Sequence, residues 1–584
     1  MSVDPFSLLW PRPQLFERRA GTWERSAAPR VSTLPAGTLR PGGYRLRAGS
    51  DGIAIEAADA AGRRHASTTL AQILRLHRET SSIQSFEIDD WPDFPRRGVL
   101  LDVSRSKVPR TDTLLALVDW LAALKIDELQ LYTEHTFAYA GHDEVWNESS
   151  PFTPDEIRAL DAFCRERGVD LVPNQQSLGH MHRWLVHERY RDLAEVPEGV
   201  EHAFSRAREP FSLCPTDPET LAFLAGLYDQ LLPCFGSARF DVGLDEAFDI
   251  GTGRSRDACA TRGKARVYLD FLREVHRLAR DRGRRIQCWA DGMLQHPEIL
   301  AEIPRDTIAL AWGYEADHPF ERELGALAAS GLSFYVCPGT SSWQSVAGRA
   351  TNGAANLAHA AIHGREARAA GYLVTDWGDR GHLQPPFASL PGFLLGAGFA
   401  WNASAATARD VPLASLLDEH AFGDAAGVLG QTALALGDAY LETGCPSTNG
   451  SALFFLLAFA AEPLPHARMP GLSAEGLARA RASVAASRAR LGEARGARPD
   501  AELVVAEMRW AADVLLFACS FGIARLATPP GAPASAIPVA ARRRLAAELD
   551  PLIAEQRRLW LLRNRPGGLE ESAGWLARVL EGLA

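Results

Sequence analysis

The sequence predicts an α/β protein built around a (β/α)8 TIM barrel, with a small N-terminal α+β domain and a C-terminal helical domain. Three observations lead to this prediction. Short apolar runs alternate with amphipathic helical stretches through the middle of the chain, the runs number eight, and they end in polar and aromatic residues. Such alternation is typical of parallel strands joined by helices.

The chain length sets the number of domains. With 584 residues the protein is too long for a single ordinary core, so we expect three domains, at 1–90, 91–405 and 406–584. Alternating runs from Tyr44 and Gly52 and a helical pattern from His65 predict the first domain. Helical spacing of Ala, Leu, Arg and Glu predicts the last, which carries no recognisable motif and either closes the side of the barrel or forms a homodimer contact.

The eight apolar runs are the expected barrel strands, at 98–105, 127–135, 169–177, 238–246, 285–293, 307–315, 332–343 and 371–379. Eight parallel strands close a barrel. An open, doubly wound sheet is the structural alternative. Its nucleotide sites require a glycine-rich first turn, however, and here only a lone Gly-Thr-Gly fragment at Gly251 occurs.

Composition excludes several classes of partner. The 62 basic and 72 acidic side chains give a net charge of −10 without long charged blocks, which argues against a nucleic-acid partner. No apolar stretch of 18 residues occurs and the first residues lack a secretory pattern, so we expect no membrane partner and a cytoplasmic location. The eight cysteines are scattered without zinc-ligand spacing, so we expect no metal and no cofactor.

The ends of the expected strands carry aromatic, acidic and basic residues. The carboxyl ends of barrel strands form the active-site face, so these residues should meet at one mouth. A single tryptophan there is as readily a core residue as a binding residue, but four at successive strand ends indicate a sugar site: Trp289, Trp312, Trp343 and Trp377. Flat apolar rings cover pyranose faces, while carboxylates and arginine bind hydroxyls.

Asp245 and Glu246 are adjacent carboxylates after the apolar run FDVGL. Most Asp-Glu pairs lie in solvated turns or at helix starts, but a pair at the end of a barrel strand is well placed for acid chemistry. A second negative charge nearby raises the pKa of one carboxyl and leaves a protonated acid near neutral pH.

Residues 66 to 400 resemble the family 20 glycoside hydrolases, the β-N-acetylhexosaminidases. The resemblance rests on HASTTLAQIL, on the segment WPDFPRRGVLLDVSRSKVPRTDTLLALVDWLAALKID, on a third strand bearing a histidine, on GLDEAFDIG and on DWGD. Two departures indicate a divergent subgroup. The fourth-strand motif begins Asp241-Val242-Gly243 instead of with His or Asn, and Thr133-Glu134-His135 replaces an Asp-rich second strand.

The resemblance implies an exo-acting, retaining, substrate-assisted mechanism in which the acetamido oxygen of the substrate is the nucleophile. Glu246 is then the general acid and base, and Asp245 orients the acetamide and stabilises the oxazolinium intermediate. The implied partner is a glycan or glycoconjugate with a terminal β-linked N-acetylhexosamine. The choice between GlcNAc and GalNAc and the linkage stay open.

The resemblance also implies binding roles. Arg105 grips the C3 and C4 hydroxyls, and Asp379 binds the C4 or C6 hydroxyl. His180 supports the catalytic acid, whereas the neighbouring His182 has no counterpart. Glu134 is either a hydroxyl ligand or a partner for His180.

Aromatic residues are expected around the sugar. Trp289, Trp312 and Trp377 form the walls of the pocket, and Trp343 lies in its mouth. Tyr335 hydrogen-bonds the acetamide oxygen. These aromatic assignments depend on the register of each strand.

Two other readings of the site stay open. One is a carbohydrate-binding pseudoenzyme that keeps the aromatic bowl without turnover. The other is a conventional glycosidase with two separated carboxylates, Glu246 together with Glu315 or Asp291. Dependence on a 2-acetamido group distinguishes all three.

Overall fold

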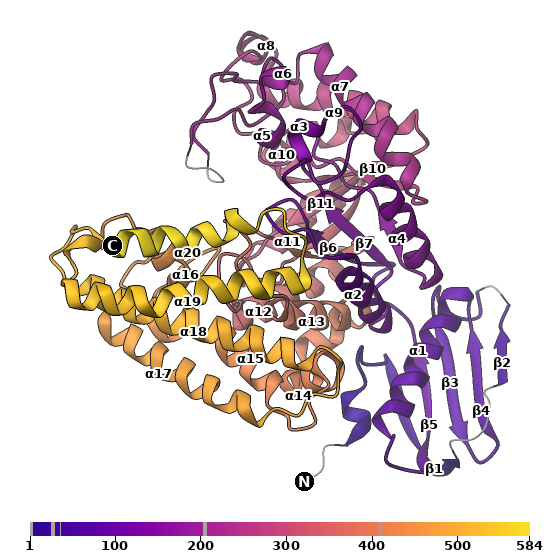
Figure 1. Ribbon diagram of the computed structural model, residues 1–584. Coiled ribbons are helices and arrows are strands. Elements are labelled where there is room, and N and C mark those ends of the chain that lie inside the picture. Colours follow the sequence, from indigo (N-terminus) through magenta and orange to yellow (C-terminus); the bar gives the residue numbers. More distant parts are fainter. Residues whose placement is uncertain (1–3, 25–29, 36, 203–206, 409) are drawn as a thin grey trace.

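The computed structural model describes residues 4–24, 30–35, 37–202, 207–408 and 410–584. It has three parts, an N-terminal sheet with one helix, a central barrel and a group of C-terminal helices (Figure 1). The sheet and the C-terminal helices lie on different sides of the barrel. The described chain contains no helix that is both long and apolar enough to cross a membrane.

The N-terminal part is a five-stranded sheet in the order β1-β5-β3-β4-β2, covered by α1 (Ala60–Leu76). The two predicted alternating runs are the antiparallel strands β3 (Tyr44–Gly49) and β4 (Gly52–Ala57). Three strands were not predicted: β1 (Leu15–Glu24), β2 (Arg30–Thr33) and β5 (Ser82–Asp90). Strand β1 is exposed along most of its length, so its sequence lacks the apolar alternation that marks a half-buried strand.

Each predicted barrel run overlaps one strand of an eight-stranded sheet. They are β6 (Arg96–Asp102), β7 (Glu128–Tyr132), β8 (Asp170–Val172), β9 (Arg239–Asp241), β10 (Arg285–Trp289), β11 (Ile308–Trp312), β12 (Ser333–Cys337) and β13 (Gly371–Asp376). The order is β8-β7-β6-β13-β12-β11-β10-β9, with parallel pairing throughout. A parallel bridge between Asn174 and Asp241 closes the ring, and Gln175 N donates to Asp241 O at 3.0 Å. The predicted barrel is therefore confirmed.

Helices cover the outside of the barrel: α2 (Thr111–Ala123), α4 (Pro154–Glu166), α7 (Pro218–Leu231), α9 (Lys264–Arg280), α11 (Phe320–Ser330), α12 (Ala350–Glu366) and α13 (Leu390–Trp401). Local sequence explains where they begin. At α4, Thr153 and Glu156 form a reciprocal capping box, and Pro154 occupies the first turn, where its missing N–H costs nothing. After β10 only α10 (Asp291–Leu294) and a 3₁₀ helix at Pro297–Glu302 follow.

The amino-terminal end of the barrel interior holds a polar cluster made of Glu128, Gln130, Arg239, Gln287 and Tyr335. Arg239 Nη1 donates to the Tyr335 hydroxyl at 2.6 Å, and that hydroxyl donates to Glu128 Oε2 at 3.2 Å. Gln130 and Gln287 donate to the other oxygen of Glu128, at 2.9 and 3.2 Å. The buried charges of this end are thus paired with each other and with neutral donors.

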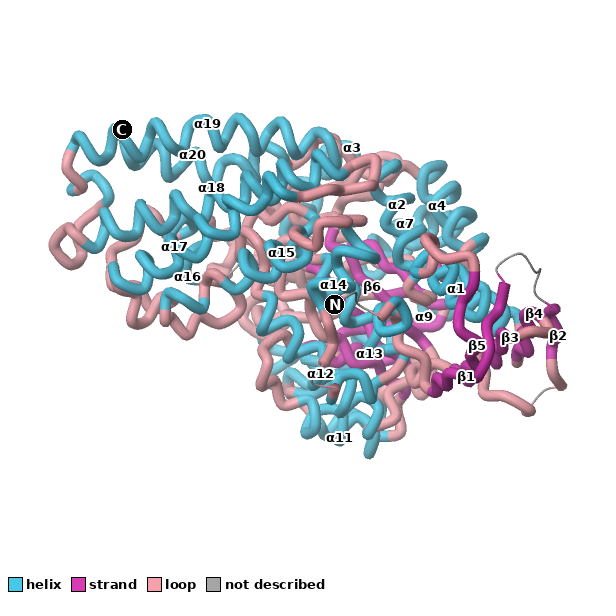
Figure 2. Tube along the Cα trace, turned by 90° about the horizontal axis from the view of Figure 1, so that it is seen from below, coloured by secondary structure: helices cyan, strands magenta, loops and turns pink. Residues whose placement is uncertain are grey.

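The C-terminal part is helical, as predicted. Its helices are α14 (Leu413–Leu417), α15 (Leu429–Asp438), α16 (Ala452–Ala458), α17 (Ala474–Arg490), α18 (Ala501–Leu526), α19 (Val539–Arg563) and α20 (Leu569–Leu583). The long helices α17 to α20 lie side by side (Figure 2). Strand-like hydrogen bonds attach the α19–α20 connection to the barrel, since Arg565 N donates to Val108 O at 2.8 Å and Arg110 N donates to Arg563 O at 2.9 Å.

Gly568 fixes the start of α20 against the loop that follows β6. Its φ is +74°, and a Cβ at this position would lie 1.7 Å from the carbonyl oxygen of Ser106. Only glycine satisfies both the left-handed backbone and this close approach. The N-terminal turn of α20 is therefore held at the mouth of the barrel.

Candidate active site

A cavity of about 420 Å³ opens at the carboxyl ends of the barrel strands. This volume lies within the range of small-molecule sites, about 300–1,000 Å³. Nine of the eleven residues singled out from the sequence line it: Arg105, Glu134, Asp245, Glu246, Trp289, Trp312, Trp343, Trp377 and Asp379. His180 lies directly behind Asp245 and Glu246, and Tyr335 lies elsewhere. We call this cavity the central pocket.

The turn after β9 brings the two adjacent carboxylates to one histidine. His180 Nε2 lies 3.3 Å from Asp245 Oδ2 and 3.0 Å from Glu246 Oε2. Left-handed backbone makes this possible, with φ of +70° at Gly243, +73° at Leu244 and +48° at Glu246. In a regular strand, neighbouring side chains would point to opposite faces.

The two carboxylates differ in exposure and in hydrogen bonding. The side chain of Asp245 is 10% exposed and that of Glu246 is 38% exposed. Gln176 Nε2 donates to Asp245 Oδ1 at 2.8 Å, and Gly243 is required here because a Cβ would meet the Gln176 amide. Asp245 is thus held rigidly, while Glu246 keeps access to the pocket.

Protonation of His180 follows from these contacts. Burial alone would lower its pKa, but Asp245 and Glu246 outweigh burial and raise the pKa of His180 to about 10. Burial also acts to raise the pKa of Asp245, yet His180 and Gln176 hold it below its usual range. At neutral pH the histidine is therefore protonated and Asp245 is ionised.

Asp291 is a third carboxyl close to this pair. Its Oδ2 accepts from the backbone N of Glu246 at 3.1 Å, and its buried Oδ1 has no hydrogen-bond partner among the described residues. Burial, followed by the charge of Asp245, raises the pKa of Asp291 to about 7. Asp291 supports the Glu246 backbone and does not line the central pocket.

The other carboxylate considered from the sequence, Glu315, is neutralised. Arg349 donates to both of its oxygens at 3.0 Å, and Asn449 N donates to Oε1 at 2.7 Å. Glu315 lines the pocket, but both of its oxygens are occupied by this bidentate ion pair.

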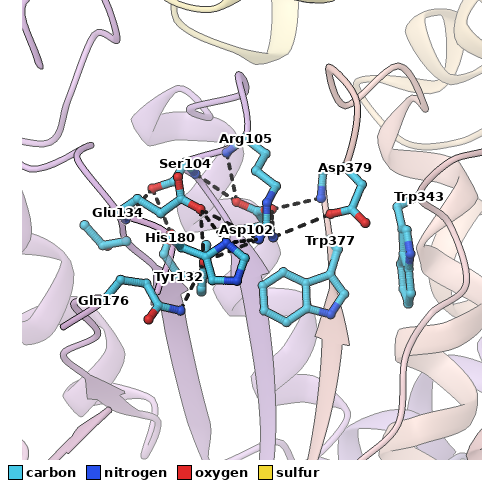
Figure 3. A network of polar contacts seen from close by, with 12 residues as sticks. Asp102, Ser104, Arg105, Tyr132, Glu134, Gln176, His180, Trp343, Trp377 and Asp379 are labelled. Atoms are coloured by element: carbon cyan, nitrogen blue, oxygen red, sulfur yellow. Dashed lines mark hydrogen bonds and ion pairs between the residues drawn. The ribbon is translucent and has the colours of Figure 1, made fainter. Parts of the chain in front are cut away.

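Arg105 is clamped between aromatic rings and carboxylates. Its guanidinium lies 4.9 Å from the ring centre of Tyr132 and 5.0 Å from that of Trp377. Its nitrogens lie 3.1 Å from Asp102 Oδ2 and 3.5 Å from Asp379 Oδ1. Figure 3 shows Arg105 between Glu134 and His180 on one side and Trp377 and Asp379 on the other. A rigid fork of this kind is suited to neighbouring hydroxyls.

Glu134 lines the pocket, as a hydroxyl ligand must, and also lies near His180, as a partner of that histidine must. Its Oε1 accepts from the Tyr132 hydroxyl at 3.0 Å, lies 3.7 Å from Arg105 Nη2 and lies 3.9 Å from His180 Nδ1. Burial raises the pKa of Glu134, and the charge of Arg105 opposes the rise. The side chain is thus buried behind Arg105 and His180, while its edge still reaches the pocket.

Aromatic rings form the wall of the pocket opposite Glu134. Trp377 Nε1 donates to the hydroxyl of Tyr314 at 2.9 Å, and Trp312 stacks on Tyr314 with 5.2 Å between ring centres. Trp343 packs edge-on against Tyr314 at 5.0 Å. Tyr314 was not singled out from the sequence, although Trp312-Gly313-Tyr314 places two rings just beyond β11.

The structure does not bring Tyr335 to the pocket, so its expected placement is wrong. Tyr335 is the third residue of β12, and its hydroxyl bonds Arg239 and Glu128 at the amino-terminal end of the barrel. The strand register decides this, since the tyrosine lies within the strand and not beyond its carboxyl end. Tyr314 is the tyrosine that the pocket contains.

Some further pocket residues are neighbours in the sequence of predicted site residues, namely His182, Arg183, Gln344 and Arg380. Others come from distant segments without a recognisable motif, namely Asn449, Arg468, Glu571 and Trp575. Asn449 Oδ1 accepts from Trp343 Nε1 at 2.8 Å, and Gln344 Nε2 donates to Asp379 at 3.3 Å. No sequence signal connects residues such as Asn449 or Trp575 to the barrel, because only tertiary packing places them here.

His180, Asp245 and Glu246 also have the composition of a metal site. One ligand atom from each lies within 4.8 Å of the others. Without an ion the raised pKa of His180 favours the protonated form, which can donate to the carboxylates beside it. We therefore interpret the three residues as a hydrogen-bonded proton site.

The closed parallel barrel with a pocket at the carboxyl ends of its strands places the protein among the TIM-barrel proteins. Two family models identify its family. The model described as "Glycosyl hydrolase family 20, catalytic domain" matches residues 94–359, and "Glycosyl hydrolase family 20, domain 2" matches residues 10–91. Together they cover more than half of the chain. The chain belongs to glycosyl hydrolase family 20.

Sequence relatives agree with this assignment. The chain is 27% identical to a β-hexosaminidase of Akkermansia muciniphila, over 36% of this chain and 46% of the relative. It is 25% identical to a β-hexosaminidase of Vibrio furnissii, over 47% of this chain and 49% of the relative. It is 27% identical to hexosaminidase D of Bos taurus, over 38% of this chain and 63% of the relative. The chain thus spans between about half and two thirds of the length of these relatives.

Solved structures share the fold at low sequence identity. A chitobiase of Flavobacterium johnsoniae superimposes with a TM-score of 0.57 at 16% identity, covering 96% of this chain and all of that chain. A crystal structure of a β-N-acetylhexosaminidase superimposes with a TM-score of 0.57 at 21% identity, covering 68% of this chain and 90% of that chain. The similarity to the Flavobacterium protein therefore extends beyond the barrel into both flanking parts.

Proposed function

We propose that this chain is an exo-acting, retaining β-N-acetylhexosaminidase that removes terminal GlcNAc or GalNAc by substrate-assisted catalysis. The observation that carries the proposal is the contact of His180 with both Asp245 and Glu246 at the edge of an aromatic pocket. Family membership and the names of the relatives support the same activity. The substrate class is a glycan or glycoconjugate with a terminal β-linked N-acetylhexosamine.

In the first step the acetamido oxygen of the substrate attacks C1 while the bond from C1 to the leaving oxygen breaks. Glu246 gives its proton to that oxygen, because its side chain reaches the pocket. Asp245 accepts a hydrogen bond from the acetamide nitrogen and stabilises the positive charge that develops on the oxazolinium. His180 and Gln176 keep Asp245 ionised and fixed for this task.

In the second step water attacks C1 and opens the oxazolinium ring. Glu246, now a carboxylate, takes the proton from the water and returns to its starting state. Arg105 and Asp379 hold the ring hydroxyls through both steps. Trp289, Trp312 and Tyr314 surround the acetamide methyl and exclude water other than the nucleophile.

Two experiments test the proposal. Nitrophenyl β-glycosides of GlcNAc, GalNAc and glucose are assayed side by side, and we expect hydrolysis of at least one acetamido sugar and negligible hydrolysis of the glucoside. Comparable rates on the glucoside would favour the two-carboxylate glycosidase, and no hydrolysis of any would favour the pseudoenzyme.

The second experiment is a calorimetric titration with a thiazoline mimic of the cyclised N-acetylhexosamine. Intermediate analogues commonly bind about 10²-fold or more tightly than substrates. We expect the thiazoline to bind at least that much more tightly than the parent sugar, and the difference to disappear in Asp245→Asn. Equal affinity for thiazoline and plain sugar in the wild type would refute the mechanism.

A further inference from the structure

The C-terminal helix α20 forms part of the wall of the central pocket. Glu571 and Trp575 lie one helical turn apart on α20, and both line the pocket that contains Asp245 and Glu246. Residues at this spacing share one face of a helix. This face is held in place by Gly568, which packs against the carbonyl oxygen of Ser106.

The indole of Trp575 is fixed from two sides. A Cβ at Gly381 would lie 2.4 Å from its Cδ1, and the guanidinium of Arg578 lies 4.5 Å from the ring centre. Indole rings provide broad apolar surfaces that cover sugar faces. Trp575 therefore has the placement and the rigidity of a sugar platform.

A second hollow adjoins the central pocket. It has a volume of about 780 Å³ and shares four lining residues with the pocket, Ser104, Ser106, Arg183 and Glu571. Two of these form an ion pair, since Arg183 Nη2 lies 2.7 and 2.8 Å from the oxygens of Glu571. Both side chains are more than one third exposed, and such pairs contribute only about 0–1 kcal/mol. The ion pair therefore lies on the boundary between the central pocket and the second hollow, and it is weak enough to be broken by a ligand that occupies both.

His135 gives the second hollow an unused hydrogen-bonding group. The residue is 6% exposed and lines the hollow, and its Nδ1 has no hydrogen-bond partner among the described residues. Burial, with the nearby charge of Arg183, lowers the pKa of His135 to about 3, so the ring is neutral at physiological pH. Neutral imidazoles both donate to and accept from hydroxyls.

We infer that α20 and the second hollow form a binding subsite for a second sugar residue, the one joined to the N-acetylhexosamine in the central pocket. Trp575 covers a face of this sugar, and Glu571, Arg183 and His135 bind its hydroxyls. The inference rests on the proposed function, and it assigns to the helical C-terminal part a role in selecting extended glycans.

The test compares the wild type with Trp575→Ala, Trp575→Phe and Glu571→Gln. Glu581→Gln is the matched control, because Glu581 is an exposed glutamate on the same helix, outside the residues that line either space. The substrate is the nitrophenyl β-glycoside of the GlcNAc dimer, and the thiazoline mimic probes the central pocket alone.

We expect Trp575→Ala to lower kcat/KM for the dimer about 10-fold and, because Trp575 also lines the central pocket, to raise the Kd of the thiazoline by a smaller factor of at most about threefold. Trp575→Phe should restore most of the loss, Glu571→Gln should lower kcat/KM about 3-fold, and Glu581→Gln should change neither quantity. An unchanged kcat/KM in Trp575→Ala would overturn the inference. Equal losses in dimer hydrolysis and thiazoline binding would overturn it too, since they would indicate a structural role.

The products identify where the second sugar is attached. If the subsite holds the leaving part of the substrate, Trp575→Ala slows formation of nitrophenyl GlcNAc. Direct release of nitrophenol with an intact disaccharide would place the second sugar on a ring hydroxyl of the cleaved unit and would contradict the exo-acting activity on which the inference rests. A wild type that neither binds thiazoline nor cleaves the dimer would refute the proposed function as well, whereas an active wild type with unaffected variants would refute this inference alone.

Discussion

The two ends of the barrel interior both bury charged side chains, but they satisfy them differently. At the amino-terminal end Arg239 is paired with Glu128 and Asp170, and Tyr335 and two glutamines complete the hydrogen bonds. At the carboxyl-terminal end Asp245 and Glu246 contact a single histidine, and Asp291 lies against the Glu246 backbone, so three carboxyls form a crowded cluster. In the first cluster both carboxylates are paired with Arg239, whereas in the crowded cluster Asp291 Oδ1 has no hydrogen-bond partner among the described residues.

This difference separates the buried charges that stabilise the barrel from those that can take part in proton transfer. Pairing with Arg239 compensates the buried charge of Glu128, which would otherwise be left unpaired in the barrel interior. In the crowded cluster burial and the charge of Asp245 raise the pKa of Asp291 to about 7, and shifted groups of this kind are typical of catalytic sites. Substitutions at the two ends should therefore affect different measurements.

The largest expected effect is on catalysis, at the mouth. Glu246→Gln should lower kcat about 10²- to 10⁴-fold on substrates with poor leaving groups, because the amide cannot donate the proton that general-acid catalysis supplies. The fold should be retained, since the side chain is 38% exposed. Steady-state kinetics and a thermal melt check both parts, with the exposed Glu166→Gln as control. Near-normal turnover would remove Glu246 from the mechanism.

At the opposite end the expected effect is on stability. Arg239→Met should lower the free energy of unfolding by about 3–5 kcal/mol, because Glu128 is left buried without its cation. The remaining folded protein should keep its kcat. Urea denaturation measures the loss, and Arg277→Met, which breaks an exposed ion pair on α9, should cost at most about 1 kcal/mol. A large fall in kcat at unchanged stability would contradict the division between the two ends.

A pH series tests the histidine that joins the crowded cluster. The pKa of His180 is raised from 6.5 to about 10, so its protonated form contributes stability that is fully present below pH 6.5. This contribution is lost as the pH rises from 6.5 through 10. Melting temperatures over that range should fall more steeply for the wild type than for His180→Gln. Parallel curves for the two proteins would show that the ion pair of His180 with Asp245 does not stabilise the fold.

The smallest expected effect concerns substrate affinity. Arg105→Lys should weaken binding of monosaccharide ligands roughly 10-fold, because an ammonium cannot reproduce the bidentate grip of a guanidinium on two neighbouring hydroxyls. Calorimetry measures the change, and Arg110→Lys on the surface serves as control. Affinity equal to that of the wild type would show that Arg105 only fills the space between Tyr132 and Trp377.

Much of the barrel could be predicted because each strand is a short apolar run followed by a polar strand end. The same pattern located Arg105, Asp245, Trp289 and Asp379, since any residue just beyond a barrel strand reaches the mouth. It could not distinguish Tyr335 from Tyr314. Both tyrosines lie in apolar runs, and only the point where each strand ends decides whether the ring enters the interior or the pocket.

Other features depend on packing between distant segments. The exposed strand β1 shows no alternation, so nothing in its sequence distinguishes it from a loop. Glu571 and Trp575 belong to an ordinary amphipathic helix, and their position at the mouth follows from the contact of Gly568 with Ser106. A glycine between two helical patterns predicts a turn but not the surface on which that turn lies.

The turn at Gly243, Leu244 and Glu246 has a consequence for laboratory evolution. Two of its residues hold left-handed backbone without being glycine, and each such residue costs about 1–3 kcal/mol. A screen that selects for heat resistance alone should therefore enrich replacements of Glu246 by glycine or asparagine, which relieve the strain at a side chain that is 38% exposed. The survivors would tolerate heat but would lack the proposed general acid. Thermal selection on this scaffold should therefore always be coupled to a screen for turnover.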